Sequence, residues 1–133
     1  MATTSRIGME LPDGSVRSIY CHWDGYPTHT GRILVDHYSD REKLENLLEL
    51  GNISLLEKEV YPDPRFDHSY DSSQSEVTVA YHRDRGEAFE PAQKSSNARS
   101  YFNNYGHSYA YLFTKEGEWC YVSSSNKNPT RLN

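Results

Sequence analysis

The stretch that decides the fold is residues 6–23, which has the sequence RIGMELPDGSVRSIYCHW. Apolar and polar residues partly alternate over 6–11 and again over 16–23, a spacing typical of strands with one buried face. Residues 12–15 separate the two runs with Pro-Asp-Gly-Ser, in which proline presets a turn and glycine tolerates a positive φ. The stretch therefore predicts a β-hairpin.

The second strand of this hairpin has two distinct faces. Alternation places Ile19, Cys21 and Trp23 on one face. The opposite face carries the remaining side chains, Val16, Ser18, Tyr20 and His22. A second turn signal, Asp24-Gly25-Tyr26-Pro27, follows immediately and ends the strand.

Two helices are expected next. The pattern becomes helical at Thr28, and a second helix follows Ser39, which has Glu42 three residues later in the spacing of a capping box. The apolar residues of this second helix recur at helical spacing, at Leu44, Leu47 and Leu48. Gly51 then supplies a C-terminal stop.

The middle of the chain is less regular. Residues 52–60 fit either a short helical turn or a strand, and residues 61–75 form a Pro-, Asp- and Ser-rich segment without a sustained period. Such a segment is longer than most connections in a domain, so we expect a loop that is either mobile or functional. Residues 76–82 predict a strand, whose one face carries Val77, Val79 and Tyr81.

The last third predicts a helix and a hairpin. Pro91 suits the first turn of a helix that ends at Gly106. Its apolar stripe consists of Ala98, Tyr101, Phe102 and Tyr105. Residues 108–114 and 118–123 alternate around a Lys-Glu-Gly turn, which predicts a second hairpin.

These elements, in the order ββ-αα-β-α-ββ, predict an α+β fold with about five strands and three helices. Because both ends form hairpins, we expect a mainly antiparallel sheet with the helices packed on one face. Residues 1–123 are expected to form a single domain, and residues 124–133 a polar, frayed tail.

Composition narrows the class of protein. A length of 133 residues suits one domain, and Leu, Ile, Val and Phe account for only 24 of them. Aromatic residues reach 13%, including 11 Tyr, so rings must supply much of the core. The net charge of −5 and the pI near 5.6 argue against general nucleic-acid binding, which needs a basic surface.

Membrane, metal and cofactor chemistry are not expected. No apolar run approaches the roughly 18 residues of a membrane helix, and the N-terminus lacks the apolar stretch of a signal peptide, so we expect a cytoplasmic protein. The six histidines and two cysteines show no zinc spacing, and no phosphate-binding glycine loop or nucleophile elbow occurs. Cys21 and Cys120 are expected to be small buried residues.

The densest cluster of chemically active side chains is residues 20–27, followed by His29. Trp23 can stack on a planar ligand, and Asp24 can orient His22 or His29. A purely structural interpretation is equally open, with Trp23 as a core anchor and the Asp24 carboxylate as a cap for the following helix.

This cluster resembles small proteins encoded by bacteriophages and prophages, which carry a near-identical His-Trp-Asp-Gly-Tyr-Pro segment after a short Asp-Gly hairpin. The resemblance rests on Ser5–Gly8, Pro12–Val16 and Ser18–Pro27, continues to Gly51 and returns at Arg83–Glu87. It implies a phage source, and hence a bacterial host cytoplasm, but no mechanism. Small phage proteins often serve host takeover or anti-defence, so an accessory role of that kind is the expectation.

A second cluster, residues 82–87, follows the strand expected at 76–82. On a strand end, Arg83 and Arg85 would point the same way and clamp a phosphate or carboxylate. Alternatively they are solvated charges that pair with Asp84 and Glu87. If both clusters converge, they form a nucleotide-like pocket. The ligand-binding residues of that pocket would be Trp23, Asp24, Tyr26, His82, Arg83 and Arg85.

Three functions remain open. The favoured one is a non-catalytic binding protein that sequesters a small anionic, nucleotide-like ligand or a host protein. The alternative is a small phosphate-handling hydrolase or transferase, with His22 or His29 as general acid/base and Asp24 orienting it. A third is an inhibitor that docks on a host enzyme through residues 24–27 and 61–75. A homo-oligomer would bury spare aromatic rings and is also open.

Overall fold

The computed structural model describes residues 2–132, which form eight strands, four α-helices and one π-helical turn. The strands are β1 (Ser5–Glu10), β2 (Val16–Cys21), β3 (Ile53–Leu55), β4 (Val79–Ala80), β5 (Gln93–Ser95), β6 (Tyr109–Phe113), β7 (Trp119–Ser123) and β8 (Thr130–Arg131). The helical elements are η1 (Pro27–Gly31), α1 (Arg32–His37), α2 (Arg41–Glu49), α3 (Tyr81–Arg85) and α4 (Ala98–Asn104).

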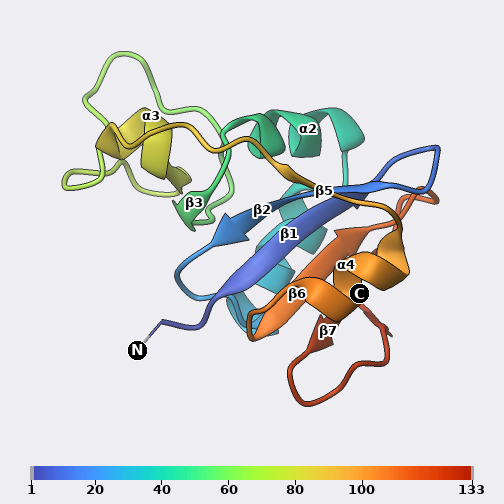
Figure 1. The fold of residues 1–133 in the computed structure, drawn as a ribbon. Helices are drawn as coiled ribbons and strands as arrows, with labels where there is room; N and C mark the ends of the chain where they lie inside the picture. Colours follow the sequence, from blue (N-terminus) through green and yellow to red (C-terminus); the bar gives the residue numbers. More distant parts are fainter. Residues whose placement is uncertain (1, 133) are drawn as a thin grey trace.

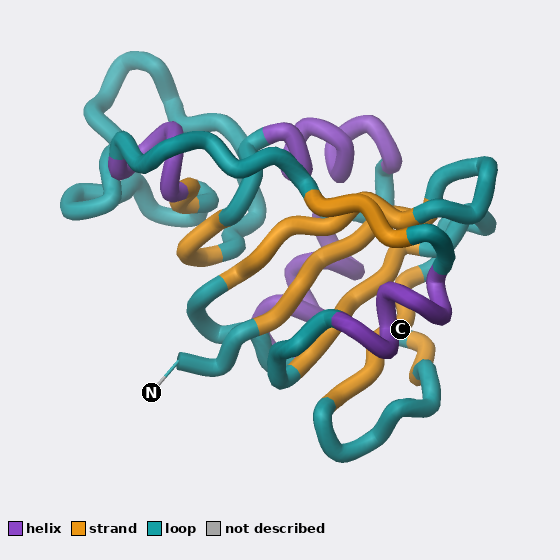
Figure 2. Tube along the Cα trace, viewed as in Figure 1, coloured by secondary structure: helices purple, strands orange, loops and turns teal. Residues whose placement is uncertain are grey.

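All strands belong to one sheet in the order β4-β3-β2-β1-β6-β7-β8, with β5 paired to β2 (Figure 2). The two expected hairpins, β1–β2 and β6–β7, are both present and antiparallel. They are joined by a parallel pairing of β1 with β6, in which Ser5 lies opposite Tyr109 and Met9 opposite Phe113. Five of the seven strand pairings are antiparallel, which confirms the predicted α+β class.

Both faces of this sheet are covered by helices. One face carries Ile7, Met9 and Ile19 and packs against the leucines of α1 and α2. The opposite face packs against Tyr101 of α4 and against Tyr105, the C-cap residue of that helix. Its sheet residues are Val16, Ala110, Leu112 and Val122. Figure 1 shows α4 in front of the sheet and α1 behind it. The expectation that all helices pack on one face is therefore wrong for α4.

The physical reason lies in β6. Its alternating positions are apolar on both faces, with Tyr111 and Phe113 on one and Ala110 and Leu112 on the other. A strand that is apolar on both faces needs a cover on each. Gly8 of β1 leaves room for that cover, because a Cβ there would lie 2.9 Å from the Tyr101 ring.

Two predicted elements differ in their bounds. The strand expected over 76–82 is reduced to β4, because helix α3 begins at Tyr81. Pro91 does not start a helix. Residues 93–95 instead pair with β2, and α4 begins after Asn97, whose side chain accepts a hydrogen bond from the Ser100 amide at 2.8 Å.

The second helix, its buried leucines and its stop at Gly51 (φ 75°) are confirmed. Its N-cap is Asp40 rather than Ser39, because the Asp40 carboxylate accepts from the Glu42 amide while the Ser39 hydroxyl donates to Val35 O. Asp40 satisfies an amide that the helix itself leaves free.

The C-terminal segment is more structured than a frayed tail. Thr130 and Arg131 form β8 on the edge of β7, and the Leu132 amide donates to Trp119 O at 2.9 Å. The sheet therefore extends beyond residue 123.

The Tyr101 hydroxyl provides a test of the α4 face. It donates to Tyr111 O at 2.7 Å in a buried environment. We expect Tyr101→Phe to lower the free energy of unfolding by about 1 kcal/mol, measured by urea denaturation. The matched control is Tyr105→Phe, whose hydroxyl accepts a longer, 3.3 Å bond from Lys127 and should cost less than about 0.5 kcal/mol. Equal losses would contradict the assignment.

Candidate functional site

The turn that follows β2 is anchored to the sheet by Gly25. The Gly25 amide donates to Thr3 O at 2.8 Å, and its carbonyl accepts from the buried Tyr111 hydroxyl at 2.7 Å. A Cβ at position 25 would lie 2.8 Å from Ser5 Cβ, so only glycine fits against β1. Asp24 precedes it with φ 53°, a conformation that Asp tolerates better than most residues. The Asp-Gly pair therefore shapes the turn.

The two rings of this turn face solvent. Trp23 is 41% exposed and Tyr26 is 38% exposed. The Trp23 indole lies edge-on to His22, with ring centroids 4.7 Å apart, and the Tyr26 hydroxyl donates to Asp24 Oδ1 at 3.3 Å. Trp23 is not a core anchor, because β2 ends at Cys21 and the alternation ends with it. Both rings are available to a ligand or partner.

The residues of the catalytic alternative, His22, His29 and Asp24, do not contact one another through hydrogen bonds. His29 Nε2 donates to Leu56 O at 3.2 Å, and His22 Nδ1 is hydrogen-bonded to the Tyr20 hydroxyl at 2.5 Å. Within residues 2–132, the Asp24 carboxylate bonds to Tyr26 and has no hydrogen bond or ion pair with either imidazole. The structure does not assemble the His–Asp pair that the catalytic alternative requires.

The two arginines do not form a clamp. They lie on helix α3 instead of a strand end, so positions i and i+2 point in different directions. Arg83 points inward and donates to Val60 O at 2.6 Å and to Thr78 O at 2.8 Å. Arg85 lies over the Tyr70 ring at 4.5 Å and pairs with Glu87 at 3.3 Å. Each guanidinium already has partners within the chain.

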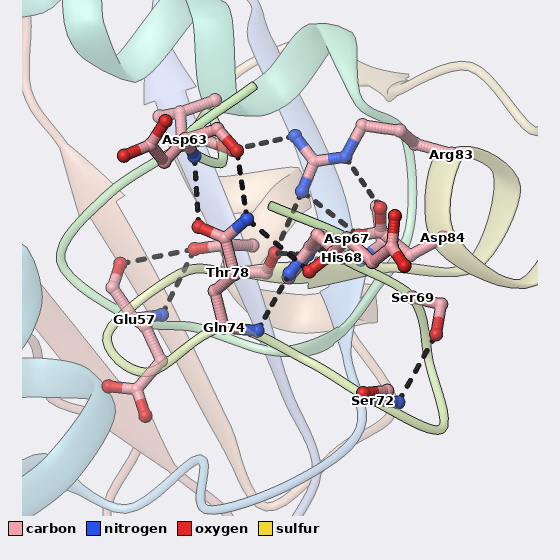
Figure 3. Close-up of polar contacts among 12 residues, drawn as sticks. Glu57, Asp63, Asp67, His68, Ser69, Ser72, Gln74, Thr78, Arg83 and Asp84 are labelled. Atoms are coloured by element: carbon pink, nitrogen blue, oxygen red, sulfur yellow. Dashed lines mark hydrogen bonds and ion pairs between the residues drawn. The ribbon is translucent and has the colours of Figure 1, made fainter. Parts of the chain in front are cut away.

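Beside Arg83 lies a polar network that sequence reasoning missed (Figure 3). The Asp84 carboxylate is 3% exposed; it accepts two hydrogen bonds from Arg83 at 2.8 and 2.9 Å, and one from the Ala80 amide at 2.7 Å. Burial by itself would raise the pKa of Asp84. The hydrogen bonds from Arg83 and Ala80, together with the charge of Arg83, outweigh burial and hold that pKa below its usual range.

His68 completes the network and is 2% exposed. Its Nδ1 accepts from the Gln74 amide at 3.0 Å, so the proton of the neutral ring must reside on Nε2. Nε2 lies 3.3 Å from both Asp84 Oδ2 and Thr78 O. Both ring nitrogens are therefore engaged, and the imidazole has no free nitrogen with which to transfer a substrate proton.

The network fixes the shape of the loop 61–75. The Gln74 side chain accepts from the Asp63 amide at 2.9 Å and donates to the carbonyls of Asp63 and Phe66 at 2.9 and 3.1 Å, which ties the two ends of the loop together (Figure 3). Sequence reasoning left this loop either mobile or functional, and the contacts make it well tethered. No spacing rule links His68 or Gln74 to Asp84, so only the structure could reveal the network.

A surface pocket of about 330 Å³ lies between β2, α3 and the segment that leads to β5. Its lining residues are Tyr20, Leu50, Asn52, Tyr81, His82, Glu87, Ala88 and Glu90. Of the predicted ligand-binding residues, only His82 lines it. Trp23, Asp24, Tyr26, Arg83 and Arg85 do not, so the two sequence clusters do not converge on this pocket.

One wall of the pocket depends on Gly51. The φ of Gly51 is 75°, and a Cβ there would lie 2.4 Å from Glu90 O and 3.2 Å from the Phe89 ring. The Asn52 side chain, which also lines the pocket, donates to Glu90 Oε2 at 2.7 Å and accepts from the Tyr20 amide at 3.0 Å. Asn52 thus joins β2 to the segment that carries Glu90.

Thiol chemistry is not favoured. Burial raises the pKa of Cys21 to about 12 and that of Cys120 to about 11. Both cysteines are free thiols, and Cys21 is buried as expected, while Cys120 is only partly buried.

In the described part of the chain, no three side chains from His, Cys, Asp and Glu gather closely enough to hold a metal ion. None of the helices between residues 2 and 132 has the length and apolar character to span a bilayer.

The buried carboxylate should make stability pH-dependent. The folded-state pKa of Asp84 lies below its unfolded value of about 3.9, so its contribution is complete above that pH and is lost as the pH falls through the folded pKa. We expect Asp84→Asn to cost about 3 kcal/mol at pH 7, because Arg83 loses its ionic partner. This cost, measured by urea denaturation, should shrink as the pH falls below about 4. A constant difference would contradict the assignment.

The wall at Gly51 allows a matched pair of substitutions. Gly14 has φ 88° with no atom near its Cβ position, whereas Gly51 has φ 75° and backbone in the way. Gly14→Ala should therefore lower the free energy of unfolding by about 1 kcal/mol, which is the cost of placing alanine at a positive φ. Gly51→Ala should cost about 2 kcal/mol more, because Glu90 must also move. Thermal unfolding of both variants measures the difference. Similar losses of stability would show that the backbone at Glu90 moves aside at little cost.

Comparisons of this chain with models of protein families, with curated proteins and with solved structures found no match. The resemblance to phage proteins carried by residues 22–27 therefore stays a prediction, and the functional argument rests on the geometry of the site.

Proposed function

We propose that this protein acts by binding another protein, as an accessory factor of a phage in its bacterial host, and that the docking surface lies at the end of the sheet where β2 ends. The observation that carries the proposal is the distribution of exposed large apolar side chains. In the described residues these are Trp23, Tyr26, Tyr61, Phe66 and Phe89. All five come from the turn after β2 or from the segments that flank α3.

These segments lie at the same end of the molecule, on the left in Figure 1. Hydrogen bonds connect them: the Trp23 amide donates to Ser54 O at 2.8 Å, and His29 donates to Leu56 O just before the loop. Exposed Trp, Tyr and Phe are enriched at the anchoring positions of protein interfaces. Five such side chains at one end support a docking surface there.

The tethering of loop 61–75 supports the same proposal. Phe66 is 66% exposed, yet its backbone carbonyl is held by Gln74. A loop that is already ordered loses less conformational entropy when it binds, which favours affinity. In this proposal, the buried pairing of His68 with Asp84 helps to hold Gln74, and Gln74 in turn holds Phe66 at the surface.

Binding is better supported than catalysis. The alternative catalytic groups His22 and His29 are hydrogen-bonded to Tyr20 and Leu56, and neither contacts Asp24. The anionic-ligand version is less well supported than the protein version, because Arg83 and Arg85 are engaged inside the chain. The third interpretation from sequence, docking through residues 24–27 and 61–75, agrees best with where the exposed rings lie.

Site-specific photo-crosslinking in bacterial cells tests this proposal. A benzoylphenylalanine replaces Phe66, and in a control chain it replaces Glu116, an exposed residue in the β6–β7 turn at the opposite end of the sheet. We expect one adduct of discrete mass from position 66 and none from position 116. Adding Trp23→Ala should reduce the yield of that adduct at least about tenfold, because interface anchors carry most of the binding energy.

Two outcomes would overturn the proposal: no adduct at position 66, or the same adducts at positions 66 and 116. An adduct whose yield is unaffected by Trp23→Ala would restrict the docking surface to the loop and exclude the turn.

A further inference from the structure

The pocket beside α3 has an unusual balance of hydrogen-bonding groups. His82 Nδ1 donates to Glu87 O at 2.7 Å, so Nε2 of the neutral ring is an acceptor. Glu87 and Glu90 add carboxylate acceptors to the lining. None of its eight lining residues, all within the described chain, is a lysine or an arginine. The pocket therefore offers acceptors and negative charge.

The two carboxylates are not equivalent. Glu87 Oε2 lies 3.3 Å from Arg85 Nη1, which offsets part of its charge. Glu90 accepts a hydrogen bond from the neutral Asn52 amide and has no ion pair within residues 2–132. An exposed carboxylate at a pocket wall without a cationic partner attracts a cation from outside. Glu90 is thus the main source of attraction.

Two aromatic rings complete the pocket. Tyr20 and Tyr81 line it, and burial raises the pKa of both phenols, so both rings remain neutral at physiological pH. The face of a phenol ring attracts ammonium and guanidinium groups. Rings together with carboxylates form a setting that suits an organic cation on an aliphatic stem.

We propose that this pocket receives an arginine or lysine side chain of the protein partner. The proposal rests on the docking function above and names a chemical feature of the partner. Glu90 would neutralise the cation, His82 Nε2 would accept a hydrogen bond from it, and Tyr20 or Tyr81 would contact the stem or the charged head. A volume of about 330 Å³ lies at the low end for ligand pockets, which suits one long side chain.

Neighbouring features place the pocket beside the proposed docking surface. Phe89, which is 47% exposed, lies between the lining residues Ala88 and Glu90, and its ring packs edge-on to His82 with centroids 5.4 Å apart. On the other side, Tyr20 contacts His22, which contacts Trp23. Aromatic contacts therefore run from the pocket toward the exposed Trp23, so one partner can reach both.

An NMR titration tests the proposal on the whole protein without a partner. The probes are Nα-acetyl-arginine methylamide, Nα-acetyl-lysine methylamide and adenosine monophosphate. We expect the two cations to shift the amide signals of Asn52 and Ala88 in a saturable manner, and the nucleotide to leave them unchanged. Glu90→Gln should weaken cation binding about tenfold, because it removes the unpaired charge but keeps an oxygen that can accept from Asn52.

Matched variants sharpen the result. Glu87→Gln should weaken binding less than about threefold, since Arg85 already offsets that charge. Glu116→Gln changes the net charge equally, far from the pocket, and should have no effect. Dispersed spectra of each variant exclude unfolding as the cause of a loss.

The proposal is overturned if neither cation shifts the pocket signals, if Glu90→Gln and Glu116→Gln behave alike, or if the nucleotide binds there in preference. Its failure is distinguishable from that of the docking function. Crosslinking at position 66 without cation binding would remove the pocket and keep the docking surface. Cation binding without crosslinking would leave a cation site, but would remove the partner side chain as its occupant.

Discussion

The parallel pairing of β1 with β6 is the constraint on which the rest of the structure depends. It unites two hairpins that are each too small to form a core, and it creates a sheet with two apolar faces. It also brings Tyr111 to the turn after β2, where its hydroxyl holds Gly25 O. The same pairing thus builds the core and positions the turn that carries Trp23.

The chemistry of the molecule is concentrated at one end of this sheet and is mostly internal. Asp84, His68 and Arg83 satisfy one another within the chain, while five large aromatic side chains at this end are exposed to solvent. Charge that is engaged inside a protein contributes to shape, whereas unpaired charge contributes to recognition. By that criterion Glu90 differs from Glu87, the other carboxylate of the pocket, which pairs with Arg85.

Local chemistry made part of this structure predictable. The Pro-Asp-Gly-Ser turn and the leucine spacing before Gly51 specify a hairpin and a helix through interactions within a few residues. The partner of β1 and the cover over Ala110 depend on contacts far apart in the chain, which spacing does not encode. The prediction of an arginine clamp was wrong for a local reason. The Ala80 amide donates to the Asp84 carboxylate, which favours the start of a helix where alternation indicated a strand. The exposure of Trp23 followed from a strand that ends two residues early.

The β1–β6 pairing also has a kinetic consequence. Its strands are far apart in sequence, with Ser5 paired to Tyr109, so this part of the sheet closes only after β6 has been synthesised. Until then β1 has an unpaired edge on a nascent hairpin, and such edges invite pairing with other chains. Folding should therefore be slow for a domain of this size, and overproduction at high temperature should favour aggregates over the native fold.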